Sequence, residues 1–306
     1  MSRYRLITRQ VENGSRSGIV IDGNVFDPVG IFDDPAYGSV QGILEDWSEA
    51  AVKIAAFAAI VAGSTPDTVP LDTCKLLAPL PRPGTIYCVG ANFRDHVDAV
   101  AKRFGLPLET DPRERGLDPW FFLKSSSCVV GPDANVPLAS NFLDWEGELA
   151  AVIGRQARDV SVDHALECVA GYTIANDLSA RDRAQREMVA AASPFRFDWI
   201  GHKNFDGGCP LGPWIVPADA IPDPQSIGIR TSVNGVPRQD SSTRQMLFTV
   251  AEQIAFLSSR ITLYPGDVVL TGTPAGTGIE TGECLRHGDL VEVEIEQIGK
   301  LVTHVR

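Results

Sequence analysis

The stretch that decides the fold is Asp144-Trp145-Glu146-Gly147-Glu148-Leu149-Ala150-Ala151-Val152-Ile153-Gly154. Its apolar tail, residues 149–153, predicts a buried strand, and residues i and i+2 of a strand point to the same side. Glu146 and Glu148 should therefore face the same way, and two like charges so close together disfavour each other's ionised form. A divalent cation would relieve that repulsion, because carboxylate oxygens suit Mg²⁺, Mn²⁺ or Ca²⁺. A solvent-facing edge strand often carries the same Glu-x-Glu pattern, so the pair alone leaves both interpretations open.

A third carboxylate follows the next apolar segment and favours the cation. Residues 171–175 predict a second buried strand, and Asp177 lies just past its end. Functional side chains are often found at such positions, where a rigid scaffold holds them. Glu146, Glu148 and Asp177 would together form a three-carboxylate face that binds one cation and leaves its other positions to water and substrate.

Further motifs keep one order along the chain. They are Gly90-Ala91-Asn92-Phe93-Arg94-Asp95-His96, Phe121-Phe122-Leu123-Lys124, Trp145-Glu146-Gly147-Glu148-Leu149, Ala175-Asn176-Asp177-Leu178-Ser179-Ala180-Arg181-Asp182, Lys203-Asn204-Phe205-Asp206, Cys209-Pro210-Leu211-Gly212-Pro213-Trp214, Val233-Asn234-Gly235, Met246-Leu247-Phe248 and Gly266-Asp267-Val268-Val269-Leu270-Thr271-Gly272-Thr273-Pro274-Ala275-Gly276. With these motifs the sequence resembles the fumarylacetoacetate hydrolase family, and within it the branch of acylpyruvases and 2-hydroxyhepta-2,4-diene-1,7-dioate isomerases. The first 75 or so residues carry little of the resemblance.

The predicted fold class is α+β and predominantly β. The resemblance implies a mixed β-roll catalytic domain, assigned to residues 76–306, behind a small strand-rich N-terminal domain of residues 1–75. Turn residues and apolar spacing predict individual elements. These are a hairpin around Asp22-Gly23-Asn24, a helix over 49–62, a hairpin at Asn234-Gly235, an amphipathic helix over 244–260 and a last strand over 290–296.

Composition and charge limit the classes of partner. The chain has 306 residues and a formal net charge of −12, which argues against nucleic acid or an anionic membrane, since both need a basic surface. An anionic substrate would then need a bound cation, a lysine or an arginine. The six cysteines form no Cys-x-x-Cys pair, which predicts free thiols in a reducing compartment. The first residues lack the apolar core of a signal peptide, so we expect a soluble cytoplasmic protein.

His96 is the first candidate catalytic residue, because it alone of the five histidines lies in a family motif. The resemblance implies a histidine that pairs with a glutamate three residues later, and this pair activates water. The present chain has Ala99 at that position. We expect Asp98 to orient His96 if the segment is looped; otherwise Glu109, Glu114 or another residue of the following stretch must do so, or water activation is weaker.

Three cationic residues could act beside the carboxylates. Lys203 matches the active-site lysine of the family, which implies an ammonium that balances the carboxylates and holds an anionic oxygen. Arg181 could bind a substrate carboxylate through two hydrogen bonds, or could simply pair with Asp182 or another acid. Lys124 is a weaker candidate of the same kind.

Two loops complete the predicted site. The glycine-rich run 271–278 lacks the pattern of a P-loop or dinucleotide site, but the Gly272 backbone and the Thr273 hydroxyl could bind a carboxylate. The polar stretch 102–119 predicts either a mobile surface loop or a lid over the metal.

The leading functional prediction is a metal-dependent hydrolase that cleaves a C–C bond in a small 2,4-dioxo acid, of acylpyruvate or fumarylpyruvate type. Its cofactor would be Mg²⁺ or Mn²⁺, with Ca²⁺ as a further option. The alternative is a decarboxylase or keto–enol isomerase of 2-oxo dioates from aromatic catabolism, which the substitution at Ala99 favours. A non-catalytic dicarboxylate-binding protein is a third hypothesis. The resemblance also implies a homodimer, with the helix over 244–260 and the strand around 268–270 as candidate interface elements.

Overall fold

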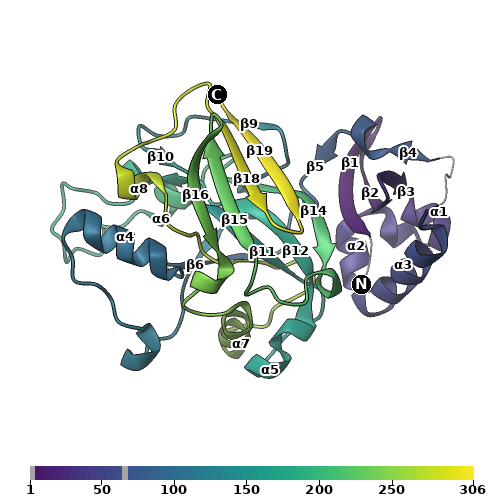
Figure 1. The fold of residues 1–306 in the computed structure, drawn as a ribbon, viewed down its shortest axis with the longest axis horizontal. Helices are drawn as coiled ribbons and strands as arrows, with labels where there is room; N and C mark the ends of the chain where they lie inside the picture. Colours follow the sequence, from purple (N-terminus) through teal and green to yellow (C-terminus); the bar gives the residue numbers. More distant parts are fainter. Residues whose placement is uncertain (1–3, 64–67) are drawn as a thin grey trace.

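The computed structural model describes residues 4–63 and 68–306, whose strands form two main sheets (Figure 1). The larger sheet has the order β4 (Val69–Pro70), β3 (Asn24–Phe26), β2 (Gly14–Ile21), β1 (Arg5–Val11), β14 (Cys209–Pro217), β12 (Val169–Asn176), β11 (Gly147–Ile153), β17 (Val268–Leu270), β6 (Ile86–Gly90) and β7 (Trp120–Lys124), with β5 (Leu76–Leu77) paired to β1 and β8 (Val129–Val130) paired to β14. The second sheet has the order β16 (Val236–Ser242), β15 (Gly228–Val233), β18 (Leu290–Ile295), β19 (Gly299–Val305) and β9 (Ala134–Val136). The short strands β10 (Leu143–Asp144) and β13 (Ser179–Ala180) pair with each other.

Most helices that accompany these sheets are short. They are α1 (Pro28–Phe32), α2 (Val40–Glu45), α3 (Trp47–Val61), α4 (Arg94–Phe104), α5 (Val162–Ala165), α6 (Trp199–Lys203), α7 (Val250–Arg260) and α8 (Gly278–Thr281). Figure 1 shows α1–α3 together with β1–β4 at one end of the molecule, whereas α4 lies at the other end. Within the described ranges, no helix is long and apolar enough to cross a membrane.

Strand β11 lies in the interior of the larger sheet and is buried along its whole length. Leu149, Ala151 and Ile153 pack into a core with α7 and the second sheet. Ala150 and Val152 pack on the opposite face, into the core that contains α2 and α3. The alternative of a solvent-facing edge strand is therefore excluded for this segment.

The predicted fold class and several local predictions are confirmed. The turn at residues 22–23 connects β2 and β3, and the turn at residues 234–235 connects β15 and β16. The alanine-rich segment forms α3. All six cysteines are free thiols.

Three local predictions differ from the structure. The helix predicted over 244–260 begins only at Val250, because Thr249 and Glu252 form a capping box there. The strand predicted to be the last one, β18, is followed by β19, its antiparallel neighbour. The candidate interface strand β17 lies between β11 and β6 and is buried, so no edge of it is free in the sheet.

The strands of residues 1–75 continue the sheet of the rest of the chain. Strand β1 is antiparallel to β14, with Leu6 opposite Ile215, and β5 is antiparallel to β1. The division into domains of residues 1–75 and 76–306 stays a prediction.

Candidate active site

Strand pairing brings the three predicted metal ligands together. Glu146 directly precedes β11, Glu148 lies within it, and Asp177 directly follows β12. The two strands are antiparallel neighbours, and the Asp177 N–H donates to the Glu146 carbonyl oxygen at 2.8 Å. One carboxylate oxygen from each residue lies within 4.8 Å of the others, and all three side chains are buried. Three oxygen donors in this arrangement fit a single hard cation.

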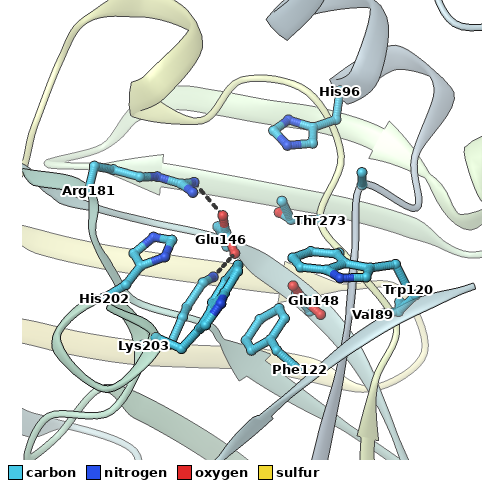
Figure 2. A pocket seen from close by; sticks show the side chains of 13 residues that line it. Val89, His96, Trp120, Phe122, Glu146, Glu148, Arg181, His202, Lys203 and Thr273 are labelled. Carbon is cyan, nitrogen blue, oxygen red and sulfur yellow. Dashed lines mark hydrogen bonds and ion pairs between the residues drawn. The ribbon is translucent and has the colours of Figure 1, made fainter. Parts of the chain in front are cut away.

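Buried cationic side chains contact two of these carboxylates. Lys203 Nζ lies 2.7 Å from both Glu146 Oε2 and Asp177 Oδ2. The Arg181 guanidinium contacts Glu146 Oε1, and its Nε donates to Asp144 Oδ2 at 2.9 Å. Figure 2 shows Arg181 and Lys203 reaching Glu146 from different sides. The predicted cations therefore belong to the site, and each is paired with a carboxylate.

The two glutamates differ in electrostatic environment. Burial disfavours the charged form of both. For Glu146, the charges of Lys203 and Arg181 outweigh burial and hold its pKa well below the ordinary value. For Glu148, burial and the negative charges of Asp177 and Glu146 raise its pKa well above the ordinary value. A divalent cation would favour the ionised form of Glu148, so this donor set fits a metal electrostatically as well as geometrically.

Lys124 holds a carboxylate in place. Its Nζ contacts Asp177 Oδ1 and donates to the Leu178 carbonyl oxygen at 3.1 Å. The side chain is buried. The structure thus gives Lys124 a positioning role on Asp177, where the sequence predicted contact with substrate.

The glycine-rich loop also supports the carboxylates. The Gly272 N–H donates to Glu148 Oε2 at 2.7 Å, and its φ of +92° is one that glycine adopts without strain. The Thr273 hydroxyl donates to the Gly147 carbonyl oxygen at 3.0 Å and accepts from Gln239 at 2.8 Å. The predicted carboxylate-binding loop therefore binds a carboxylate of this chain, Glu148.

His96 lies in the first turn of α4 and pairs with a glutamate from a distant segment. Its Nδ1 is 2.5 Å from Oε1 of Glu280 in α8. Glu280 also accepts from the Gly276 N–H at 2.7 Å and from the Thr277 hydroxyl at 3.0 Å. The side chains of the pair are only 13% and 8% exposed. A carboxylate accepts hydrogen bonds, so this contact places the proton of a neutral imidazole on Nδ1. The other ring nitrogen, Nε2, can then accept a proton.

Glu280 makes the contact with His96 that the sequence analysis had expected from Asp98, Glu109 or Glu114. The structure pairs Asp98 with Arg94 at 3.8 Å, so Asp98 is not placed to orient the histidine. Glu109 pairs with Arg115 at 2.7 Å. Glu280 was missed because it lies 184 residues away in the chain. The indication in the sequence was an acid two residues after the glycine-rich run 271–278.

A cavity of about 220 Å³ lies at this site, and it is smaller than the roughly 300–1,000 Å³ of pockets for drug-sized ligands. His96, Glu146, Glu148 and Lys203 line it. Figure 2 shows His96 on one side of the carboxylates and the ring of Phe122 on the other. The aromatic wall consists of Trp120, Phe122 and Trp199, whose ring centroids lie 5.3 to 5.8 Å apart.

A second histidine, His202, also lines the cavity and was not singled out in the sequence. Its side chain is buried, and its Nε2 has no hydrogen-bond partner among the described residues. Burial, followed by the charges of Lys203 and Arg181, lowers the pKa of His202 to about 3. His202 is therefore neutral at physiological pH.

The predicted lid is partly helical and partly irregular. Residues 102–104 end α4, and a short 3₁₀ turn follows at Pro112–Arg115. Arg113 ties this segment to α7 through Glu252 at 2.7 Å. Closure over a ligand stays a prediction.

Comparison with known proteins agrees with this geometry. Residues 85–306 match the C-terminal domain of fumarylacetoacetate hydrolase. The chain belongs to the fumarylacetoacetate hydrolase family. The family predicted from the sequence is therefore confirmed.

Relatives in this family carry several names. The mitochondrial oxaloacetate tautomerase FAHD2A of Homo sapiens is 37% identical over 299 residues, covering 96% of this chain and 86% of that protein. The fumarylacetoacetate hydrolase from Exiguobacterium antarcticum has a TM-score of 0.75 at 32% identity, with 99% of each chain covered. Maleylpyruvate hydrolase from Sphingobium sp. SYK-6, in complex with manganese(II) ion and pyruvate, has a TM-score of 0.73 at 27% identity, with 98% of each chain covered. The family thus includes hydrolases and tautomerases, and this chain belongs to a family of enzymes.

Proposed function

We propose that this protein is a divalent-cation-dependent keto–enol tautomerase of small 2-oxo acids. The observation that carries the proposal is that His96, held through Nδ1 by Glu280, lines the same small cavity as Glu146, Glu148 and Lys203. A proton-transfer group thus faces a carboxylate cluster suited to a cation. The tautomerase name of the human relative supports this reaction class.

Glu146, Glu148 and Asp177 would hold the cation, and Mg²⁺ or Mn²⁺ fits three carboxylate oxygens best. When bound, such a cation polarises the carbonyl of a 2-oxo acid and stabilises negative charge on its oxygen. The manganese(II) and pyruvate in the maleylpyruvate hydrolase structure support this assignment.

His96 would move the proton at carbon. In ketonisation Nε2 of His96 would take the proton of the enol hydroxyl and deliver it to carbon 3, while the C2=C3 double bond gives way to the C2=O double bond; enolisation runs the same transfers in reverse. Glu280 keeps the imidazole in one tautomer through Nδ1, so that Nε2 exchanges the proton. The Lys203 ammonium beside Glu146 and Asp177 would stabilise the oxyanion of the intermediate.

Hydrolysis of a C–C bond in a 2,4-dioxo acid is the second candidate, and one observation favours it. The alanine at position 99 had argued against a water-activating pair, and the contact of His96 with Glu280 supports one. His96 would then take a proton from water, whose oxygen attacks the distal carbonyl, and the pyruvate enolate leaves when the C–C bond breaks.

A product screen distinguishes these functions. The protein with Mg²⁺ or Mn²⁺ is given oxaloacetate and acylpyruvates, the enol is followed by its ultraviolet absorbance, and products are identified by NMR. Faster enol–keto exchange without new products supports the tautomerase, whereas pyruvate with a free acid supports hydrolysis. Release of CO₂ would indicate a decarboxylase. Tight binding without any conversion would contradict both enzymatic proposals and favour a dicarboxylate-binding protein.

The assembly and location also remain proposals. We propose a homodimer that acts in the cytoplasm on an anionic keto acid, without nucleic acid or membrane as a partner. The net charge of −12 supports the exclusion of polyanionic partners.

A further inference from the structure

A second cavity lies directly beside the first. Its volume is about 530 Å³, and it lies between α4 and the segment that follows that helix. Its walls are largely apolar and include Val97, Val100, Leu106 and Leu108. Leu106 and Leu108 are 58% and 66% exposed. Apolar surface of this kind, next to a candidate active site, is suited to covering an apolar ligand.

The two cavities share part of their walls. His96 and Ala91 line both of them. Ala91 directly follows β6 and has a φ of +51°, which non-glycine residues rarely adopt. Such backbone conformations are found where the surrounding structure holds a residue in a special position. A ligand that extends from the carboxylate cluster past His96 would therefore enter the second cavity.

The charges of the two cavities differ. Arg181 and Lys203 line the first together with Glu146 and Glu148, so an anionic head group would be attracted there once a divalent cation is bound. Among the described residues around the second, Arg115 is the one Lys or Arg and Glu109 the one acid, and they pair with each other at 2.7 Å. Both are more than half exposed, so their pairing leaves little net field in the cavity. A second carboxylate on the ligand would gain no free cation there and would lie near Glu109.

We propose that the second cavity binds the uncharged hydrocarbon tail of a 2-oxo acid whose head group binds at the carboxylate cluster. The proposal rests on the head-group site of the proposed function and narrows its substrate class. A four-carbon acid would leave the second cavity empty. A medium-length acylpyruvate would fill both cavities, and it suits either candidate reaction because it can enolise and also be hydrolysed.

The test uses inert probes, so that it does not depend on which reaction occurs. N-methyl, N-propyl and N-pentyl oxamate carry the same metal-chelating head with tails of increasing length. Their dissociation constants are measured by calorimetry on the full chain loaded with Mn²⁺. Each added methylene should tighten binding about two- to fourfold, as expected for its burial in an apolar site. An oxamate of equal length that ends in a carboxylate should bind more weakly than its alkyl counterpart.

Two variants test the location of the tail. Val100→Phe should fill the cavity, and Leu108→Asp should introduce a charge into its wall. Both should flatten the dependence of affinity on chain length. The matched control is Ile60→Asp on α3, an exposed apolar position at 80% exposure that is outside both cavities. In this control variant, the affinity should increase with the length of the oxamate tail as it does in the wild type.

The outcomes separate the inference from the function on which it rests. If N-methyl oxamate binds only with Mn²⁺ but longer tails add nothing, the head-group site stands and the tail cavity is refuted. If no oxamate binds, the head-group site is wrong and the inference fails with it. A third outcome is that affinity does not change with tail length and that Leu108→Asp converts a dimer into monomers. A second copy of the chain would then cover this surface, which also overturns the proposal.

Discussion

Replacement of Glu280 by glutamine should reverse the tautomer of His96. Glu280 Oε2 accepts from the Gly276 N–H, and Oε1 contacts both His96 Nδ1 and the Thr277 hydroxyl. In Glu280→Gln the amide oxygen must stay at the Gly276 N–H, since that donor needs an acceptor. The amide NH₂ then faces Nδ1 and donates to it. The imidazole proton moves to Nε2, and the nitrogen that should accept a proton can no longer do so.

The size of the effect follows from the hydrogen bonds involved. Recovery of the productive tautomer requires the amide to flip, which breaks the bond to the Gly276 N–H and turns an amide NH₂ toward it. An unsatisfied buried donor costs about 1–3 kcal/mol and a hydrogen bond about 0.5–1.5 kcal/mol, so the flip costs about 2–4 kcal/mol. Little solvent screens the pair, whose side chains are 13% and 8% exposed. At about 1.4 kcal/mol per tenfold change, kcat should fall about 30- to 1,000-fold.

The assay is enol–keto exchange of oxaloacetate, or hydrolysis of an acylpyruvate if that is the reaction found. Mn²⁺ affinity and the midpoint of thermal unfolding should change little, because Glu280 contacts none of the three carboxylates in the structure. Glu283→Gln is the matched control, since Glu283 lies three residues further on and pairs with Arg238 away from His96. A kcat for Glu280→Gln within threefold of the wild type would refute the pairing as a part of the mechanism.

Four further predictions test the site and the assembly. Glu148→Gln should weaken Mn²⁺ binding at least about 10-fold in calorimetry, and unchanged affinity would count against the three-carboxylate centre. His202 has an ordinary pKa of 6.5 when unfolded and of about 3 when folded, so the unfolded chain binds a proton that the native state does not, and stability falls as the pH drops through this window. Between pH 7 and pH 5, the free energy of unfolding measured in urea should therefore fall by about 2 kcal/mol less for His202→Asn than for the wild type. An equal fall in both proteins would show that this histidine is not responsible. Residues 102–119 should be cut by protease less readily when Mn²⁺ and oxalate are bound, whereas equal cutting would indicate a static loop. Light scattering at micromolar concentration should give twice the chain mass, and a monomer would contradict the homodimer.

The carboxylate cluster could be predicted from the sequence because its determinants are local. Glu146 and Glu148 come two residues apart beside an apolar run, and Asp177 ends the next apolar strand. The antiparallel pairing of β11 with β12 then brings these positions together, as the structure shows. Only the adjacency of the two strands had to be assumed, and neighbouring strands in the sequence are usually neighbours in a sheet.

The acid that pairs with His96 could not be predicted in the same way. Glu280 reaches the histidine through packing of α8 against α4, a contact between segments 184 residues apart. No periodicity connects these segments. The nearby acid Asp98 instead pairs with Arg94 on the surface of the same helix, at 3.8 Å. The sequence also named residues 268–270 as a candidate interface strand, because three apolar residues do not show whether a strand lies inside a sheet or at its edge.

The charge of the site explains how an acidic chain can bind an anionic acid. Four buried carboxylates are arranged with three cations, of which Lys124 and Lys203 are buried and Arg181 is partly buried; the carboxylates are those of Asp144, Glu146, Glu148 and Asp177. When all are ionised, one negative charge is left over. Burial, and after it the charges of Asp177 and Glu146, raises the pKa of Glu148. A divalent cation would turn that excess into one positive charge. It would also compete with Lys203 for Glu146 and Asp177, which would free the ammonium to contact the substrate. Affinity for an anionic keto acid should therefore depend on the cation, and the binding of oxamate with and without Mn²⁺ measures that dependence directly.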